Sequence, residues 1–580
     1  MKPATGQWSW RLGLALVVVL ATAACVVYAP AIDGGLIWDD VQVFVTENPL
    51  NRDLSGLVTI WTSFAAVDYW PLVYSAFWVE WQLWGEAPRG YHLVNIGLHI
   101  GAATVLALVL RRLAVRGWWV AALLFVVHPV NVEAVAWISQ QKTLLSTALM
   151  LASGLLYLRA GQGSGRRPGG DLPALAVFTL ALLAKTSVVA FPVALLGYEA
   201  LERGISRATL MRLLPFFLVA ILGGSLTIAC NAAHDTGTVH DRDLATRVAG
   251  MGAAGWFYAG KAVWPVDLCF VYPRWDIDPR RAVDWLPCLA WIIVLTVAYR
   301  GIRSWGRAVL AGVGWYLLML APASGIVDIY FLTYAPVADH YQYPALPGLL
   351  ALLSHGLTVA AGRGIAWLRG RWPGSPILVG RLAHGAVGVV GAVAVIALAS
   401  GARGRAAVFI DAETLWRDTL RRNPRSDLAY NNLGALLRDR GDDAGALACY
   451  REVMRLPADS AAAAMAETNF RGLTALRAFH AGELPRAAHE LDLLVAAPHF
   501  PHRHLVPEAV AAVLNLRGRI AVLLGDGQTA VRMFTASLEA LPVGNLEAVA
   551  FLRAMRRGTK TTTDAVADVR AESGTVKTGP

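Results

Sequence analysis

The feature that most constrains this chain is a series of apolar runs, each long enough to cross the roughly 30 Å hydrocarbon core of a bilayer. Hydrophobic residues make up 56% of the 580 residues and charged residues only 16%, which is far from the average of soluble proteins. The chain is therefore predicted to be an all-α, polytopic membrane protein with the lipid bilayer as its surroundings.

The apolar runs predict about eleven transmembrane helices. The stretch 173–201 is long enough for two short crossings, whereas 250–272, which contains Lys261, is interpreted as an interfacial or re-entrant segment. The other predicted spans lie near 11–31, 91–110, 118–136, 143–159, 213–232, 284–300, 306–323, 341–361 and 383–401.

Arginine clusters indicate the orientation of these spans. They fall in alternate connections, as Arg111 and Arg112 do, and Lys2 precedes the first span. Because cytoplasmic loops are enriched in Lys and Arg, the N-terminus is predicted to be cytoplasmic and the loop 32–90 to face outward. Everything after residue 401 is then also predicted to face outward. In a bacterial cell, the membrane would be the inner one and the outward side periplasmic.

Charge and cysteine usage exclude two classes of function. The formal net charge of +10 does not indicate nucleic-acid binding, because the arginines are scattered in short clusters between apolar runs. The five cysteines are widely spaced and form no CxxC pair, so neither a disulfide framework nor a zinc site is predicted.

A soluble, Ala- and Arg-rich helical pattern replaces the apolar runs after the predicted membrane domain, 1–404. Small and large residues recur here at the same offsets in two sets, with a degenerate set between them: Gly434, Gly441, Ala446 and Tyr450; Gly518, Gly525, Ala530 and Phe534; and Gly482, Ala487 and Leu491. This is the tetratricopeptide pattern, so a short α-solenoid is predicted over 405–557, with a generic helical bundle as the alternative. The tail 558–580 is predicted to be disordered, because it has almost no large apolar residues.

The outward loop 32–90 carries the acidic residues best suited to chemistry. Asp39 and Asp40 lie shortly after the first predicted span, in "IWDD", and Glu80 interrupts the aromatic stretch "DYWPLVYSAFWVEWQLWG". The aromatic stretch fits a helix lying in the membrane interface. A carboxylate among aromatic rings is costly to ionise unless it meets a cation or a metal, and this often marks function. The alternatives are a solvated pair of aspartates and a Glu80 that points to water.

Several motifs, taken in order, resemble the transmembrane-and-tetratricopeptide family of membrane glycosyltransferases, which is similar to the protein O-mannosyltransferases and shares the C-type glycosyltransferase fold. The motifs are "WDD", "YWPL", "GYHLVNIGLH", "FVVHPVNVEAVAWIS", "LLAKTSVVAFPVALL" and "ADHYQYPALPGL", followed by the repeats. The resemblance covers roughly residues 10–545. It implies a catalytic base at Asp40 or Asp39, Glu80 as a second acidic residue, and a polyprenyl-phosphate-linked sugar as donor.

The chain departs from this family at three charged positions. Trp70 stands where relatives often carry an arginine or a histidine, the stretch 140–143 reads "QQKT" in place of a charged motif, and His340 stands where an arginine is usual. Lys142, Lys185 and His340 are the remaining candidates for binding the donor phosphate; for Lys185, a snorkelling lysine at a helix end is the alternative. Three further residues are candidates for supporting roles: His128, Glu133 and Tyr341.

These features together predict the transfer of a sugar, with mannose as one candidate, to hydroxyl groups of outward-facing proteins. Asp40 would deprotonate the acceptor hydroxyl as it attacks the anomeric carbon, and cationic side chains or a divalent metal ion would stabilise the leaving phosphate. The repeats are predicted to recruit acceptor proteins. Two alternatives stay open, namely a noncatalytic membrane scaffold and a glycan polymerase or ligase that uses a lipid-linked oligosaccharide.

Overall fold

The computed structural model describes residues 10–161, 169–234, 243–326, 329–372, 375–456, 461–497, 500 and 507–556. All regular structure within these ranges is helical, which confirms the predicted all-α class. The chain divides between Asn423 and Pro424 into two compact units, which we call the membrane unit and the repeat unit. The helix α16 (Ala412–Arg422), which the predicted boundary at 404 assigned to the repeats, belongs to the membrane unit.

Eight helices within the described residues are long and apolar enough to cross a bilayer. They are, some with a short turn added at one end, α1 (Trp10–Ile32), α4 (Pro88–Arg112), α7 (Gln141–Ala160), α10 (Arg207–Ala233), α12 (Leu286–Arg300), α13 (Gly306–Leu320), α14 (Leu346–Arg371) and α15 (Pro376–Ala406). A ninth span results if α5 (Trp118–Val127) and α6 (Val132–Ala136), which are bent by 56° near Pro129, cross together. The chain is thus a multi-pass membrane protein.

If α5 and α6 count as one span, two short helices account for the difference between nine spans and the eleven predicted. The helices α8 (Leu172–Ala184) and α9 (Phe191–Glu202) have 13 and 12 residues, so neither is long enough to cross alone. The segment 250–272 contains the end of α11 (Leu244–Val263), which is not among the eight spans, and an irregular stretch after it.

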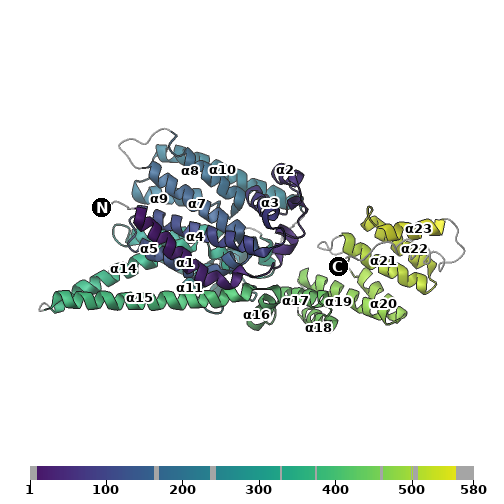
Figure 1. The fold of residues 1–580 in the computed structure, drawn as a ribbon. Coiled ribbons are helices and arrows are strands. Elements are labelled where there is room, and N and C mark those ends of the chain that lie inside the picture. Colours follow the sequence, from purple (N-terminus) through teal and green to yellow (C-terminus); the bar gives the residue numbers. More distant parts are fainter. Residues whose placement is uncertain are drawn as a thin grey trace. The chain divides into compact units, whose positions relative to one another are not determined.

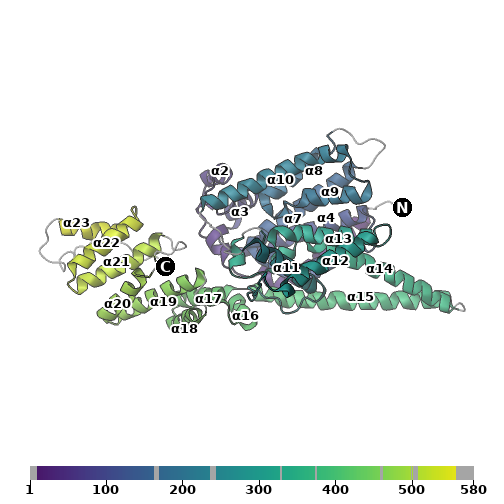
Figure 2. The same cartoon turned by 180° about the vertical axis from the view of Figure 1, so that it is seen from behind.

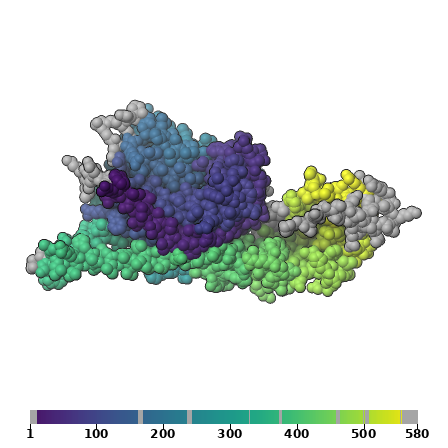
Figure 3. Space-filling model, viewed as in Figure 1, coloured from purple at the N-terminus to yellow at the C-terminus, as the bar shows by residue number. Residues whose placement is uncertain are grey.

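The helices of the membrane unit pack in an order that brings distant parts of the sequence together. The helix α4 packs against both α1 and α7, and α7 packs against α8 (Figure 1). Seen from behind, α11, α12 and α13 cover the other side of the unit (Figure 2). The helix α1, dark purple in Figure 3, lies on the surface with apolar side chains exposed, as lipid contact allows.

The connection between α1 and α4 folds over an aromatic core. It contains the single turn η1 (Asp40–Phe44), the turn η2 (Pro49–Asn51), α2 (Leu54–Thr62) and α3 (Pro71–Trp84). Pro71 occupies the first turn of α3, where its missing N–H costs nothing, and Gly85 ends the helix with a φ of +55°. The rings of Phe44, Tyr74 and Phe77 pack beneath these elements and fix the loop that carries the predicted carboxylates.

Within its described residues, the repeat unit contains three antiparallel helix pairs. They are α17 (Asp427–Asp439) with α18 (Asp443–Arg455), α19 (Ala461–His480) with α20 (Leu484–Val495), and α21 (Pro507–Leu523) with α22 (Gly527–Ala540), followed by α23 (Leu546–Arg556). A Cβ on Gly434 would lie 2.6 Å from the ring of Tyr450, and one on Gly518 would lie 2.8 Å from that of Phe534. The spacing of small and large residues therefore serves close helix packing, as predicted. The tail 558–580 lies outside the described residues.

Candidate active site

Asp40 is a buried carboxylate held by three hydrogen bonds. It accepts from the backbone N–H of Ile37 at 2.9 Å, from the backbone N–H of Ser139 at 2.7 Å, and from the Ser139 hydroxyl. Burial raises the pKa of Asp40 to about 7, although these hydrogen bonds act in the opposite direction. Asp40 thus ties the outward loop to the turn that precedes α7.

Asp39 is the more accessible of the two neighbours. It is partly exposed, whereas Asp40 is 1% exposed. Burial of the carboxyl raises the pKa of Asp39, the charge of Lys142 lowers it, and that of Asp68 raises it again. Asp39 is therefore an acid with a raised pKa that is close to a cation and still reachable.

The residue just before the two aspartates, Trp38, has an unusual backbone conformation. Its φ of +50° lies in the left-handed region, which costs a residue other than glycine about 1–2 kcal/mol. The carbonyl of Trp38 accepts from the N–H of Val41 at 2.9 Å, so the chain reverses here. Five rings surround the indole with centroids 5.9 to 6.3 Å away, and with Trp38 they form what we call the Trp38 box: Trp137, Phe270, Phe331, Tyr334 and Trp416.

Lys142 and Lys185, two of the predicted phosphate ligands, meet at the ring of Trp70. Their Nζ atoms lie 5.4 and 5.9 Å from the centroid of the Trp70 ring, and both residues are buried. Lys185 also donates to Thr143 Oγ1 at 2.8 Å, and Trp70 Nε1 donates to Thr186 Oγ1 at 3.0 Å. The tryptophan at a family-variant position thus lies beside two buried lysines. Burial and the charge of Lys142 lower the pKa of Lys185, whereas the charge of Asp68 raises it.

Asp68 was missed by the sequence analysis. It is partly exposed, and burial of its carboxyl raises its pKa while the charges of Lys142, Lys185 and His234 lower it. We call Asp39, Asp68, Lys142 and Lys185 the charged cluster. In the sequence, the only feature that pointed to Asp68 was its position just before the predicted interfacial helix, where acidic residues are common.

Glu80 lies apart from this cluster. It is 5% exposed and accepts a hydrogen bond from Gln141 Nε2 at 2.5 Å. Burial raises the pKa of Glu80 to about 8, against the smaller effect of Gln141. In the described part of the chain, Gln141 is its hydrogen-bond partner. Glu80 is thus mostly protonated at neutral pH.

The other predicted residues have partners of their own. Nδ1 of His340 bonds with Glu133 Oε1, so this nitrogen is not open to a phosphate. His128 Nε2 donates to the carbonyl of Ala262 at 3.0 Å. The ring of Tyr341 lies 6.0 Å from Lys185 Nζ and 4.2 Å from the ring of His340.

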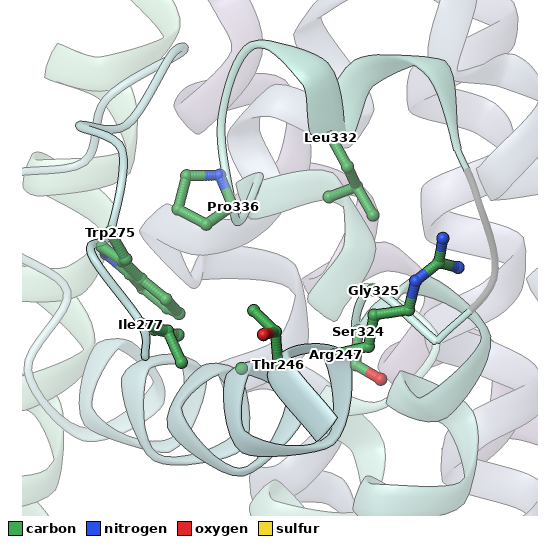
Figure 4. A pocket seen from close by; sticks show the side chains of 9 residues that line it. Thr246, Arg247, Trp275, Ile277, Ser324, Gly325, Leu332 and Pro336 are labelled. Carbon is green, nitrogen blue, oxygen red and sulfur yellow. The ribbon is translucent and has the colours of Figure 1, made fainter. Parts of the chain in front are cut away.

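The donor set does not fit the divalent metal ion considered above. Among the described residues, no group of three His, Cys, Asp or Glu side chains is placed to hold a metal. A small cavity of about 30 Å³ beside α11 is lined by Thr246, Arg247 and Trp275, among others, and not by the charged cluster (Figure 4). A cavity of this size holds little more than water, so it is not the candidate site.

The fold and the charged cluster define a multi-pass membrane protein with a loop carboxylate beside buried lysines, joined to tetratricopeptide repeats. The chain is 25% identical over 372 residues to a protein O-mannosyl-transferase of Caenorhabditis elegans, an alignment that covers 59% of the chain and 51% of the relative. It is 30% identical over 175 residues to protein O-mannosyl-transferase TMTC4 of Homo sapiens (26% of the chain, 24% of the relative). It is 33% identical over 159 residues to protein O-mannosyl-transferase TMTC1 of Mus musculus (24% and 16%).

These relatives belong to the transmembrane-and-tetratricopeptide family, so the resemblance seen in the motifs is confirmed and the chain is a relative of that family. The chain spans about half the length of the Caenorhabditis elegans protein and a quarter or less of the other two. No protein-family model matches it.

Proposed function

We propose that the protein transfers a sugar from a polyprenyl-phosphate-linked donor to hydroxyl groups of outward-facing proteins. The observation that carries this proposal is the charged cluster, in which the accessible carboxylate of Asp39 lies in the field of Lys142, beside Lys185. A displacement at the anomeric carbon needs a base for the acceptor and cations for the leaving phosphate. The names of the relatives support mannose as the sugar and proteins as acceptors.

Asp39, in place of Asp40, is the general base in this proposal. Both oxygens of Asp40 are engaged by Ile37 and Ser139, whereas Asp39 is open to a substrate. The Asp39 carboxylate takes the proton of the acceptor hydroxyl while the hydroxyl oxygen forms a bond to the anomeric carbon. The bond from that carbon to the phosphate oxygen breaks, and its electron pair leaves with the polyprenyl phosphate. A pKa raised above the ordinary range makes the base stronger at neutral pH.

Lys142 and Lys185 stabilise the negative charge that grows on the leaving phosphate. The Nζ atoms of both lysines lie within 6 Å of the centroid of the Trp70 ring, at 5.4 and 5.9 Å, so cation–π attraction helps to hold them together. Burial lowers the pKa of Lys185, and the negative charge of a bound donor phosphate would favour its protonated form. Two lysines on one ring thus supply the cations that the missing family arginines would have supplied.

The proposal places the charged cluster and the repeats on the outward side, which is periplasmic if the membrane is a bacterial inner membrane. The repeats then recruit acceptor proteins and raise their effective concentration near the site, without taking part in the chemistry.

The test uses the full-length chain, purified in lipid nanodiscs, with polyprenyl-phosphate mannose and a Ser/Thr-rich peptide. Intact-mass analysis should show hexose added to the peptide, and Asp39→Asn should lower the rate by about 10²- to 10⁴-fold. Asp33→Asn is the matched control, because Asp33 is an exposed acid of the same loop, 3.7 Å from Arg89. A folded wild type that turns over no lipid-linked sugar would support the scaffold, and transfer to glycans alone would support a polymerase or ligase.

A further inference from the structure

We propose that α16 is a positioning element for the catalytic loop, and that it acts through the contact of Trp416 with Trp38. The inference rests on the proposed function, because it concerns the placement of Asp39 for that reaction. It gives the helix that leads into the repeats a role in the chemistry of the membrane unit.

The first observation is the unusual backbone of Trp38. A large residue keeps a left-handed conformation only where its surroundings enforce it, and here the Trp38 box encloses the indole. Trp416 contributes an edge-on ring with its centroid 6.0 Å from that of Trp38, and it also lies 5.5 Å from Phe270. Trp416 is 2% exposed, so its ring is enclosed by the membrane unit.

The second observation is that α16 is anchored at both ends to other segments of the membrane unit. Just before it, the carbonyl of Ile410 accepts from the N–H of Gly35, three residues ahead of Trp38, at 2.8 Å. Just after it, Asn423 Nδ2 donates to the carbonyl of Val271 at 3.0 Å.

Within α16, the buried carboxylate of Asp418 accepts from Arg405 Nη1 at 2.7 Å and forms ion pairs with Arg421 and Arg422 at 3.1 Å. An ion pair enclosed in this way fixes the rotation of the helix, because a turn would leave a buried charge without a partner. The face of α16 that carries Trp416 therefore cannot turn away from Trp38 at low cost.

The consequence concerns Asp39 directly. Asp39 follows Trp38 in the chain, while Asp40 is fixed independently by Ser139. If the φ of Trp38 relaxed to the ordinary negative region, Asp39 would swing relative to Lys142 while Asp40 held its place. Trp416 blocks this relaxation, so it is a positioning residue for the base.

The test compares Trp416→Leu and Trp416→Phe in the full-length protein, with Trp291→Leu as the matched control. Trp291 is a buried tryptophan of the same unit that packs against Trp256 and Tyr316 and lies outside the Trp38 box. We expect Trp416→Leu to lower kcat by about tenfold to a hundredfold with little change in the KM for the donor, because misplacement of a catalytic group costs rate more than binding. It should also move the acidic limb of the pH–rate profile, since the distance from Asp39 to Lys142 changes.

Trp416→Phe should restore most of kcat, and Trp291→Leu should lower the Tm without changing kcat or the pH profile. Wild-type kcat and pH profile in folded Trp416→Leu would overturn the inference.

If Trp416→Leu does not fold, a comparison of Trp38→Gly with Trp38→Ala tests whether the positive φ at position 38 places Asp39. Glycine adopts a positive φ freely and alanine does not, so the glycine variant should keep the higher kcat. Equal rates, or a faster alanine variant, would overturn the inference. Failure of the proposed function looks different, because Asp39→Asn would then remain active or the wild type would transfer no sugar.

Discussion

Asp39 and Asp40 are adjacent in the chain, yet Asp40 accepts hydrogen bonds from the backbone and hydroxyl of Ser139 while Asp39 lies in the field of Lys142. Asp39 has right-handed helical dihedrals, in which successive side chains point in different directions, and it follows the left-handed Trp38. One carboxylate therefore fixes the loop, and the other is free to exchange a proton.

Asparagine at the two positions should have different effects. Asp39→Asn is expected to lower transfer by about 10²- to 10⁴-fold with an unchanged Tm, because it removes the base and little packing. Asp40→Asn is expected to lower the free energy of unfolding by about 1–3 kcal/mol, because an amide group replaces an oxygen that accepts from Ser139 or Ile37. This reverses the expectation from sequence, which gave Asp40 the role of the base. Rates and Tm values of both variants check it; wild-type transfer in Asp39→Asn would refute it.

The pH–rate profile should report the environment of Asp39. The base acts as carboxylate, so kcat/KM should rise with pH through the pKa of Asp39, which lies above the ordinary value of about 3.9. The charge of Lys142 lowers this pKa, so Lys142→Met should move the rise to higher pH. Lys185→Met should raise the KM for the donor and should shift the rise in kcat/KM by less than Lys142→Met does. A rise that stays in place, or moves to lower pH, in Lys142→Met would argue against Asp39 as the base.

Glu80 should make stability depend on pH. Its pKa rises from its ordinary range in the unfolded chain to about 8 in the folded one, so the folded state binds the extra proton. The contribution of Glu80 to the free energy of unfolding is fully present below pH 4 and is lost as the pH rises through 8. The Tm should therefore fall between pH 5 and pH 8. Glu80→Gln should flatten this slope and keep most of the transfer activity. A glutamine variant that is folded but inactive would instead make Glu80 part of the chemistry.

Trp70 should matter for donor binding. Trp70→Leu removes the ring that both lysines share and is expected to raise the KM for the polyprenyl-phosphate sugar by about tenfold, since each cation–π contact is worth about 0.5–2 kcal/mol. Trp70→Phe should keep part of the donor affinity, because an aromatic ring remains, but it should lose the hydrogen bond to Thr186. Trp61→Leu, at an exposed tryptophan of the same loop, is the control and should leave the KM unchanged. An unchanged KM in Trp70→Leu would show that the ring does not contribute to donor binding.

The repeat unit can be perturbed by one methyl group. Gly434→Ala would place a Cβ 2.6 Å from the buried ring of Tyr450 and should destabilise the unit by about 1–3 kcal/mol. Gly472→Ala is the control, because no atom lies within 4 Å of its Cβ position. If the repeats recruit acceptors, Gly434→Ala should slow transfer to a protein acceptor and leave transfer to a short peptide unchanged. Equal slowing with both acceptors would mean that the repeats support the site itself.

The helices could be predicted from the sequence because their signals are local. The hydropathy of an apolar run predicts a membrane span, and the sixteen-residue spacing of Gly434 and Tyr450 predicts a pair of packed helices. The site could be predicted only in part, because its geometry depends on distant contacts. The hydrogen bond from Ser139 to Asp40 joins residues 99 positions apart in the chain, and the hydrogen bond from Trp70 to Thr186 joins residues 116 positions apart. No local pattern could therefore rank the two aspartates or connect Asp68 with the lysines.

The short helix α8 has one more consequence. At 1.5 Å per residue, its 13 residues are about 20 Å long, which is some 10 Å less than the hydrocarbon core. Lys185 directly follows its last residue, so its side chain would lie below the far headgroup layer if α8 starts at the near one. A donor with a long isoprenoid tail could then present its phosphate to Lys185 while its tail stays among the lipids. Such an enzyme would draw its substrate sideways from the leaflet, and the thickness of the surrounding bilayer would become a variable of its rate.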